Sequence, residues 1–206
     1  MPAIAGIFVA KNYKNCYIYL MKNIKLSKRL KQIRLVLSDV DGVLTDGHIY
    51  LDSRGNEMKV FSCKDAPAIK MAKSAGLDVA LITGRKSTAA IARAKEHQVK
   101  IFFKNDLIKN KKSILEFLHG KYGVNKDEIL YVGDDVGDLG LMKNVGVSAT
   151  PVDGMAENKK IADIITDARG GRGVVAELIY KVLSARNEWH VHVGIYRDKY
   201  FPWKAP

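Results

Sequence analysis

The sequence is poor in cysteine, and none of its apolar stretches is long. Two cysteines among 206 residues, Cys16 and Cys63, cannot form a disulfide framework, and no CxxC motif or Cys/His cluster indicates a zinc site. The apolar run at 2–10 covers only about nine residues, whereas a bilayer span needs about twenty. No positive region precedes this run, as a secretory signal would require. These absences favour a cytoplasmic protein without a membrane span.

Acidic residues are missing from the first part of the chain. The chain carries 34 Lys and Arg against 22 Asp and Glu, with a formal net charge of +12, and its first acidic residue is Asp39. Eight basic residues come before it: Lys11, Lys14, Lys22, Lys25, Lys28, Arg29, Lys31 and Arg34. We expect residues 1–31 to form a basic, solvated N-terminal extension, with Met21 as an alternative start. No basic patch interleaved with aromatic residues predicts nucleic-acid binding.

Apolar runs of strand length alternate with segments of helical period from residue 34 onward. Strands are expected at 35–37, 77–82, 99–103, 129–132, 145–149 and 162–165, and helices at 66–74, 87–97, 111–122, 139–143 and 173–184. This alternation predicts an α/β fold, a Rossmann-like doubly wound parallel sheet with helices on both faces. We expect one domain at 32–186, followed by a C-terminal tail at 187–206 that is rich in aromatic and basic residues.

One segment departs from the alternation. The extended patterns at 48–51 and 57–61 are joined by turn-forming residues at 52–56, which is typical of a β-hairpin. The hairpin would leave from the end of the first strand, over the edge where such sheets bind ligands. The rest of the chain between Asp39 and Thr83, and between Thr83 and Asp134, is accounted for by core elements. A separate cap domain is therefore not expected.

The first strand runs into the string DVDGVLTDG, which begins at Asp39. Residues i and i+2 of an extended chain point the same way, so Asp39 and Asp41 would face one pocket. Two adjacent carboxylates repel each other unless a cation or a shared proton lies between them. Alone, the string could be an Asp-rich turn.

Further polar groups follow neighbouring strands. Thr83 and Gly84 end the strand at 77–82 and offer a hydroxyl and free N–H groups to an anion. Asp134, Asp135 and Asp138 follow the strand at 129–132, and Lys111 opens the helix between these two strands. All of these groups would converge on the ligand-binding edge of the sheet.

This set of residues predicts phosphoryl transfer through an aspartyl phosphate. Several carboxylates around an anionic substrate require a hard cation, and an all-oxygen site suits Mg²⁺. Asp39 would attack phosphorus, and Asp41 would act as general acid and then as general base. Thr83 and Lys111 would hold the phosphoryl oxygens. The metal shell would be completed by Asp134, with Asp135 and Asp138 behind it.

The strings DVDGVLTDG, LITGR and GDDVGD, together with Lys111, resemble the four motifs of the haloacid dehalogenase superfamily of phosphatases. The resemblance extends over residues 34–185. It implies that the metal is held by the carboxylate of Asp39, the backbone carbonyl of Asp41 and the carboxylate of Asp134. The lysine is the third of these motifs. The segment before it is two residues longer here than in the family, so Lys109 is the alternative to Lys111.

Finer features resemble one branch of that superfamily. The hairpin, the strings ITGRK and YVGDD, and GGRG at 170–173 are similar to the 3-deoxy-D-manno-octulosonate 8-phosphate phosphatases, which act in lipopolysaccharide precursor synthesis. The resemblance implies a homotetramer whose hairpins and tails close the uncapped sites. It also implies substrate contacts from Asp41, Gly42, Ser62, Lys64, Asp65, Lys70, Gly84, Arg85, Arg93 and Lys111. Of these, Arg85 and Arg93 would bind the sugar carboxylate.

Alternative functions use parts of the same pattern. A related branch acts on nine-carbon keto-sugar-acid 9-phosphates, but it has Glu where this chain has Arg85. A phospho-accepting receiver module shares Asp, Thr and Lys around Mg²⁺, but it needs no second acid two residues after its nucleophile. The third alternative, a polynucleotide 3′-phosphatase, would use the basic extension as a nucleic-acid arm. At the position of Ala66 the octulosonate branch usually has glycine, so the substrate loop departs from the family there.

Overall fold

The computed structural model describes residues 24–109 and 113–202. Its centre is a six-stranded sheet in the order β5-β4-β1-β6-β7-β8, in which every neighbouring pair is parallel. The strands are β1 (Leu35–Ser38), β4 (Asp78–Thr83), β5 (Lys100–Phe103), β6 (Ile129–Val132), β7 (Val147–Thr150) and β8 (Ile164–Ile165). The predicted doubly wound parallel sheet is confirmed.

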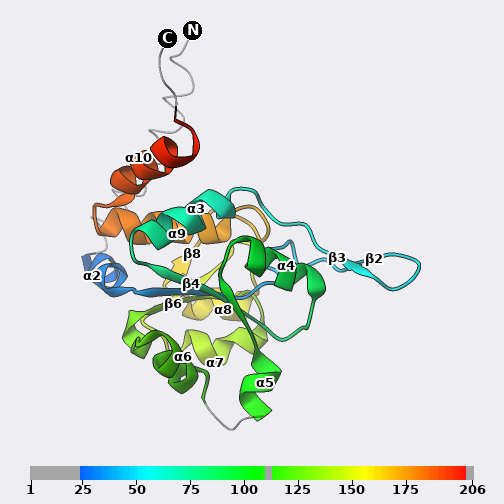
Figure 1. Cartoon of the computed structure of the whole chain (residues 1–206). Helices are drawn as coiled ribbons and strands as arrows, with labels where there is room; N and C mark the ends of the chain where they lie inside the picture. The colour runs from blue at the N-terminus through cyan, green and yellow to red at the C-terminus, as the bar shows by residue number, and fades with distance from the viewer. Residues whose placement is uncertain (1–23, 110–112, 203–206) are drawn as a thin grey trace.

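Helices cover both faces of this sheet (Figure 1). They are α2 (Ile24–Gln32), α3 (Asp65–Ser74), α4 (Thr88–Glu96), α5 (Lys104–Lys109), α6 (Ile114–Tyr122), α7 (Leu139–Met142), α8 (Ala156–Ile161), α9 (Val174–Ala185) and α10 (Trp189–Tyr200), with short 3₁₀ turns η1 (Lys126–Glu128) and η2 (Val136–Asp138). In Figure 1, α3 and α9 lie above the sheet and α6 and α7 lie below it.

Alternation along the buried strands divides the interior into two hydrophobic cores. Val36 of β1 belongs to the core shared with α2, α3 and α9, whereas Leu35 and Leu37 belong to the core shared with α6 and α7. All four residues of β1 are buried. Because both faces of the central strand are covered, its sequence is apolar from Leu35 to Leu37, and only its last residue, Ser38, is polar.

Local sequence signals account for several helix ends. The Ser87 hydroxyl accepts a hydrogen bond from Ala90 N and caps α4. Ser113 and Glu116 form a capping box at the start of α6, and Gly123 ends that helix at φ 63°. A left-handed residue after the last turn favours glycine because glycine has no Cβ to clash. The helix expected at 111–122 is therefore found from Ile114 onward, while residues 110–112 lie outside the described part.

Two helices lie in segments that were expected to be an extension and a tail. Within the predicted extension, α2 buries Leu26 and Leu30, and its Arg29 pairs with Asp163 at 2.6 Å. Within the predicted tail, α10 packs on α3, where Ser74 and His192 share a hydrogen bond of 2.7 Å. Charge dominated the sequence pattern of α2, but its two leucines, spaced i and i+4, form the apolar stripe of a packed helix.

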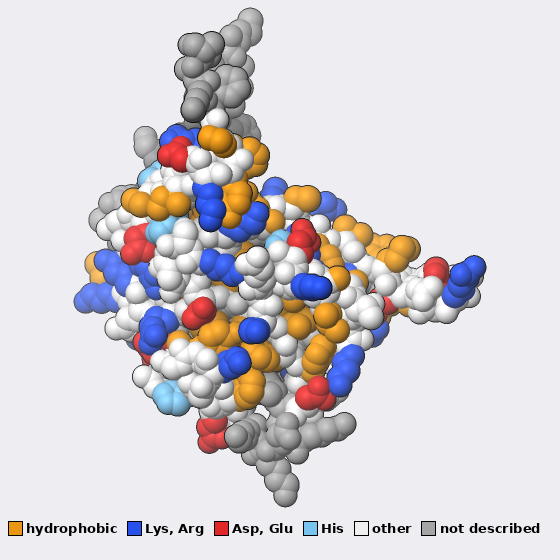
Figure 2. Space-filling model, in the orientation of Figure 1, with side chains coloured by type: hydrophobic (Ala, Val, Ile, Leu, Met, Phe, Trp, Pro, Cys, Tyr) orange, Lys and Arg blue, Asp and Glu red, His pale blue; other side chains and the backbone are white. Residues whose placement is uncertain are grey.

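The hairpin pairs β2 (Tyr50–Leu51) with β3 (Glu57–Met58) in antiparallel register, as predicted. It projects sideways from the body of the molecule (Figure 1) and is seen at the right of the space-filling view (Figure 2). Several apolar side chains of the hairpin are exposed, among them Leu51, Met58 and Val60. No helix in the described ranges is long and apolar enough to cross a membrane.

Truncating Leu30 tests whether α2 is part of the folded unit. The side chain is fully buried against α9 and the sheet, so Leu30→Ala should lower the free energy of unfolding by about 2–5 kcal/mol. Ile24→Ala, at a position that is 65% exposed in the same helix, should change it by less than about 0.5 kcal/mol. Urea unfolding measures both. Equal, small effects would mean that α2 does not contribute to the core.

Candidate active site

The predicted site residues gather where the central strands end. Asp39 directly follows β1, which lies between β4 and β6, and Thr83 is the last residue of β4. Asp39 N donates to Val132 O of β6 at 2.9 Å. Asp134 follows β6 after one glycine. Because the strands are parallel, their carboxyl ends meet at one edge, which is where open α/β sheets bind ligands.

Two of the gathered carboxylates are buried together with one lysine. Asp39 is 7% exposed and Asp138 is 1% exposed. Lys104 Nζ lies 3.1 Å from Asp39 Oδ1 and 2.6 Å from Asp138 Oδ1. Burial and the charges of Asp138 and Asp134 raise the pKa of Asp39 to about 8, although Lys104 opposes this shift. Burial disfavours the Lys104 ammonium, but the two carboxylates that it contacts raise its pKa overall.

Lys104 was not among the residues predicted from the sequence. Lys111 was predicted to contact the phosphoryl group, but it lies outside the described residues, as does the side chain of its alternative, Lys109. Lys104 directly follows β5, next to β4 in the sheet. A lysine at the carboxyl end of a strand is the sequence signal that could have found it.

Asp134 lies against the loop that follows Asp39. A Cβ built on Gly42 would come within 2.0 Å of Asp134 Oδ2, and Gly42 has φ +87°. Glycine is therefore required at residue 42 both by its backbone conformation and by the closeness of this carboxylate. Burial, followed by the charges of Asp138 and Asp135, raises the pKa of Asp134 to about 7.

The donor set fits a hard divalent cation. Asp39 and Asp134 supply carboxylate oxygens, and the raised pKa values of both show that their negative charges are poorly compensated by the chain itself. No three His, Cys, Asp or Glu side chains of the described residues form a metal-binding cluster. Mg²⁺ prefers an octahedral shell of oxygen ligands and usually keeps several waters, so Asp39 and Asp134 could supply its protein carboxylates.

Asp138 organises the loop after β6. It accepts hydrogen bonds from Tyr131 Oη at 2.5 Å, from Asp134 N at 2.9 Å and from Asp135 N at 3.3 Å. The Asp135 carboxylate instead accepts from Gly137 N at 2.7 Å, at the start of η2. Asp138 therefore supports the backbone beside Asp134 and also holds Lys104, while Asp135 caps the turn.

Thr83 is buried at the end of β4, with its hydroxyl within reach of the loop backbone. Thr83 Oγ1 accepts a hydrogen bond from Arg85 N at 3.1 Å, and the residue is 2% exposed. Gly84, between them, is exposed, and an added Cβ would meet no atom within 4 Å. The hydroxyl and the loop amides lie on the same edge as Asp39.

Asp41 is engaged by a residue from the hairpin. Its carboxylate forms an ion pair with Lys59 Nζ, and Lys59 also lies 3.0 Å from Glu57 Oε1. Glu57 in turn pairs with Arg85 at 2.8 Å. Lys59 and Glu57 were missed from the sequence, although their i, i+2 spacing at the end of a predicted hairpin strand places both on one face.

The remaining predicted substrate residues have varied surroundings. Arg93 donates to Ser62 O at 2.8 Å and pairs with Glu96, while its guanidinium lies 5.5 Å from the Phe61 ring centre. The structure gives Asp65 a buried position, where its carboxylate accepts from Ala176 N at 2.9 Å and burial raises its pKa to about 6.

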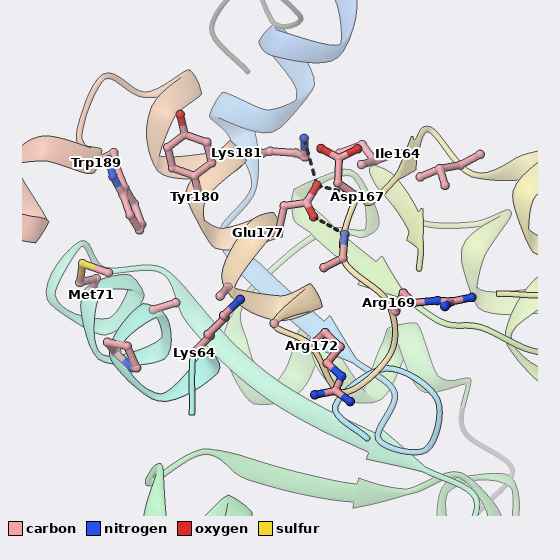
Figure 3. Close-up of a pocket in the computed structure, with 16 residues that line it drawn as sticks. Lys64, Met71, Ile164, Asp167, Arg169, Arg172, Glu177, Tyr180, Lys181 and Trp189 are labelled. Carbon is pink, nitrogen blue, oxygen red and sulfur yellow. Dashed lines mark hydrogen bonds and ion pairs between the residues drawn. The ribbon is translucent and has the colours of Figure 1, made fainter. Parts of the chain in front are cut away.

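A large pocket opens beside this edge, between α3, α9 and the segment 164–173 (Figure 3). Its volume is about 1280 Å³, and its lining includes Lys64, Arg169 and Arg172. The Arg172 guanidinium points toward the loop that follows β1 (Figure 3). Lys70 is exposed on α3 outside the pocket lining, with its ammonium 4.4 Å from the Tyr200 ring centre. The lining also contains two carboxylates, Asp167 and Glu177, and Glu177 pairs with Lys181 at 3.3 Å.

Comparisons with known proteins agree with this geometry. The sequence model of the haloacid dehalogenase-like hydrolases matches residues 59–146. The 3-deoxy-D-manno-octulosonate 8-phosphate phosphatase of Haemophilus influenzae is 32% identical over 79% of this chain and 89% of its own length. The corresponding phosphatase of Escherichia coli K12 is 34% identical over 78% of this chain and 84% of its own.

Solved structures show the same relationship. The crystal structure of the Moraxella catarrhalis octulosonate 8-phosphate phosphatase, in complex with magnesium, phosphate and the free sugar, matches with a TM-score of 0.76 and 31% identity over 84% of this chain and 98% of that one. A hydrolase of subfamily III A from Legionella pneumophila matches with a TM-score of 0.79 and 32% identity over 87% of this chain and 98% of that one.

The chain therefore belongs to the haloacid dehalogenase-like hydrolases. Within them it is a phosphoric monoester hydrolase whose relatives are the octulosonate 8-phosphate phosphatases named above.

The raised pKa values of Asp39 and Asp134 predict how stability depends on pH in the metal-free protein. Their carboxyl groups have pKa values near 4 in the unfolded chain, but about 8 and about 7 in the folded state. Between these limits the folded state holds more protons, so their contribution to stability should fall as pH rises from about 4 to about 8 and then stay constant. Added Mg²⁺ should stabilise the protein increasingly over the same range.

Urea unfolding between pH 5 and 9, with EDTA and with Mg²⁺, measures this effect. Asp134→Asn serves as the reference, because it removes one titrating group while leaving the other acidic residues in place. A shallower pH slope is expected for the variant in EDTA, together with weaker stabilisation by Mg²⁺. Identical slopes for the two proteins would contradict the assignment.

Proposed function

We propose that the chain is a Mg²⁺-dependent phosphatase that hydrolyses 3-deoxy-D-manno-octulosonate 8-phosphate through an aspartyl-phosphate intermediate. The observation that carries the proposal is the placement of Asp39 and Asp134, two carboxylates with raised pKa values, at the carboxyl ends of the central strands, with Lys104 next to Asp39. The resemblance to the Moraxella enzyme, whose structure contains magnesium, phosphate and the sugar, supports the choice of metal and substrate.

The first step transfers the phosphoryl group to the protein. A carboxylate oxygen of Asp39 forms a bond to phosphorus as the bond from phosphorus to the sugar oxygen breaks. Asp41 gives its proton to that leaving oxygen, so the sugar departs as a neutral alcohol. Mg²⁺, held by Asp39, Asp134 and the carbonyl of Asp41, would neutralise negative charge on the phosphoryl oxygens.

The second step releases phosphate. Asp41, now a carboxylate, accepts a proton from water as the water oxygen bonds to phosphorus, and the acyl phosphate bond to Asp39 breaks. This restores Asp39 and leaves Asp41 protonated for the next cycle. Lys104, together with Thr83 and the amides that follow it, lies where it could hold the equatorial oxygens in both steps.

Groups around the opening would provide specificity for a sugar acid. Arg85 and Arg93 would bind the sugar carboxylate, with Ser62, Lys64 and Lys70 on the adjoining segment. Guanidinium groups suit a carboxylate because they can bind it with two parallel hydrogen bonds. A nine-carbon keto-sugar-acid 9-phosphate is the alternative substrate.

The surroundings of the site support assembly into a homotetramer. The outward face of the hairpin exposes Met58 and Val60 beside an uncapped site, and burial of such side chains against another copy would be favourable. Within the cell, we place the enzyme in the cytoplasm, where it would act in the synthesis of lipopolysaccharide precursors.

Removing the nucleophile tests the proposed reaction. Wild type should release phosphate from octulosonate 8-phosphate in the presence of Mg²⁺ and lose this activity in EDTA, and Asp39→Asn should lower kcat by at least about 10³-fold because no acyl phosphate can form. Asp198→Asn is the matched control, because the Asp198 side chain is exposed on α10, and this variant should retain activity. Equal turnover by wild type and Asp39→Asn would refute the mechanism.

The same assay across a panel tests the substrate. Nine-carbon keto-sugar-acid 9-phosphates and hexose phosphates should be hydrolysed with a lower kcat/KM than octulosonate 8-phosphate. If the nine-carbon 9-phosphates have the higher kcat/KM, they and not octulosonate 8-phosphate are the substrates of this enzyme. Stable labelling by acetyl phosphate without turnover of any sugar phosphate would favour a receiver module instead.

A comparison of two lysines tests which of them holds the transferring group. Lys104→Met should lower kcat by about 10²–10³-fold, since it removes the ammonium next to Asp39 that would hold the phosphoryl oxygens. Lys111→Met, assayed in parallel, tests the residue predicted from the motif. A loss confined to Lys111→Met would assign the phosphoryl contact to Lys111 and leave Lys104 as a structural partner of Asp138.

A further inference from the structure

The end of the hairpin strand β3 presents alternate side chains to the site and to the outside. Met58 and Val60 are 59% and 63% exposed, whereas the Lys59 side chain is 1% exposed and that of Glu57 is 18% exposed. This alternation follows from the extended backbone, in which i and i+2 share a face. Two charged residues therefore point inward from a projecting hairpin whose outward face is apolar, the reverse of the usual pattern for a half-exposed strand.

The inward groups form a chain of alternating charge that ends at Asp41. The chain runs from Arg85 to Glu57 at 2.8 Å, from Glu57 to Lys59 at 3.0 Å, and from Lys59 to Asp41. Hydrogen bonds from Ser87, Lys59 and Arg85 lower the pKa of Glu57 to about 2, so it remains ionised. Desolvation opposes the Lys59 ammonium, but Asp41 and Glu57 raise its pKa overall.

Burial makes this lysine costly unless both carboxylates stay in place. A desolvated ammonium requires partners with good geometry, and among the described residues its ion-pair partners are Asp41 and Glu57. The Asp41 side chain is 25% exposed and could otherwise rotate into solvent. Lys59 Nζ donates to Asp41 Oδ1, so the contact fixes the direction of the Asp41 carboxyl group and leaves Oδ2 to carry the proton that is transferred.

We propose that Lys59 is a positioning residue for Asp41: the hairpin delivers this ammonium to orient the general acid, and Glu57 orients the ammonium. The proposal rests on the proposed function, since it assigns Asp41 the proton transfer. It requires no contact between Lys59 and the substrate. Its effect should therefore depend on Asp41 and on how strongly the leaving group needs a proton.

The kinetic test is a double-mutant cycle on two substrates. Lys59→Met keeps the length of the side chain but removes its charge, and it should lower kcat/KM for octulosonate 8-phosphate about 30–100-fold. For p-nitrophenyl phosphate, whose leaving group is a stable anion, the loss should be less than about 5-fold. In an Asp41→Asn background, Lys59→Met should change either rate by less than about 2-fold.

Two further variants separate positioning from a loss of structure. Lys59→Arg retains the cation and should recover most of the activity on the sugar phosphate. Arg54→Met removes a cation from the tip of the same hairpin, where the side chain is exposed, and should match wild type. Additive losses in the Asp41→Asn background, or equal losses on both substrates, would overturn the proposal, because Lys59 would then act on the substrate or on the fold.

A measurement that does not depend on turnover distinguishes failure of this proposal from failure of the proposed function. Amide hydrogen exchange of residues 57–61 should accelerate to the same extent in Lys59→Met and Asp41→Asn, and should be unchanged in Arg54→Met. If wild type hydrolyses no phosphate ester, the proposed function fails, whatever the exchange result. If wild type is active but Asp41→Asn leaves the hairpin protected, the Asp41–Lys59 link is refuted.

Discussion

The central constraint in this structure is the crowding of carboxylates at the end of a parallel sheet. Asp39, Asp134 and Asp138 are gathered there by β1 and β6, and Lys104 compensates part of their charge. Burial would favour neutral groups, so the arrangement is stable as an ionised set only when a further cation is present. The same deficit of positive charge that destabilises the metal-free site would favour binding of a divalent ion next to Asp39.

Close packing of loops makes this crowding possible. A Cβ on Gly170 would lie 2.2 Å from Gly42 O, and Gly171 N donates to Val43 O at 3.0 Å. The segment before α9 therefore rests directly on the backbone of the loop that follows Asp39. Side chains there would push the loop away from Asp134. The GGRG string is thus explained by contact between backbones, and the Arg172 guanidinium points from this junction toward the loop that follows β1 (Figure 3).

The sequence predicted the parts of the site that depend on strand ends. Asp39, Thr83 and Asp134 could be placed because each follows an apolar run, and parallel topology brings such ends together. Lys104 was not predicted because the motif pattern places its lysine at the start of a helix, whereas the ammonium next to Asp39 comes from the end of β5. Residues 24–31 were predicted to belong to a solvated extension because they are strongly basic. The apolar stripe of Leu26 and Leu30, which packs α2 on the core, is only two residues long. Contacts such as that of Lys59 depend on how the hairpin folds back, which local periodicity does not determine.

The two faces of the hairpin have opposite requirements. Its inward face is fixed by the ion pairs of Glu57 and Lys59, whereas its outward face leaves Met58 and Val60 exposed. A two-stranded ribbon has little stability of its own, so its position depends on what each face contacts. If a second copy covers the apolar face, the energy of assembly also holds Lys59 against Asp41. Oligomerisation would then contribute to catalysis by limiting hairpin motion, even without donating a residue to the neighbouring site.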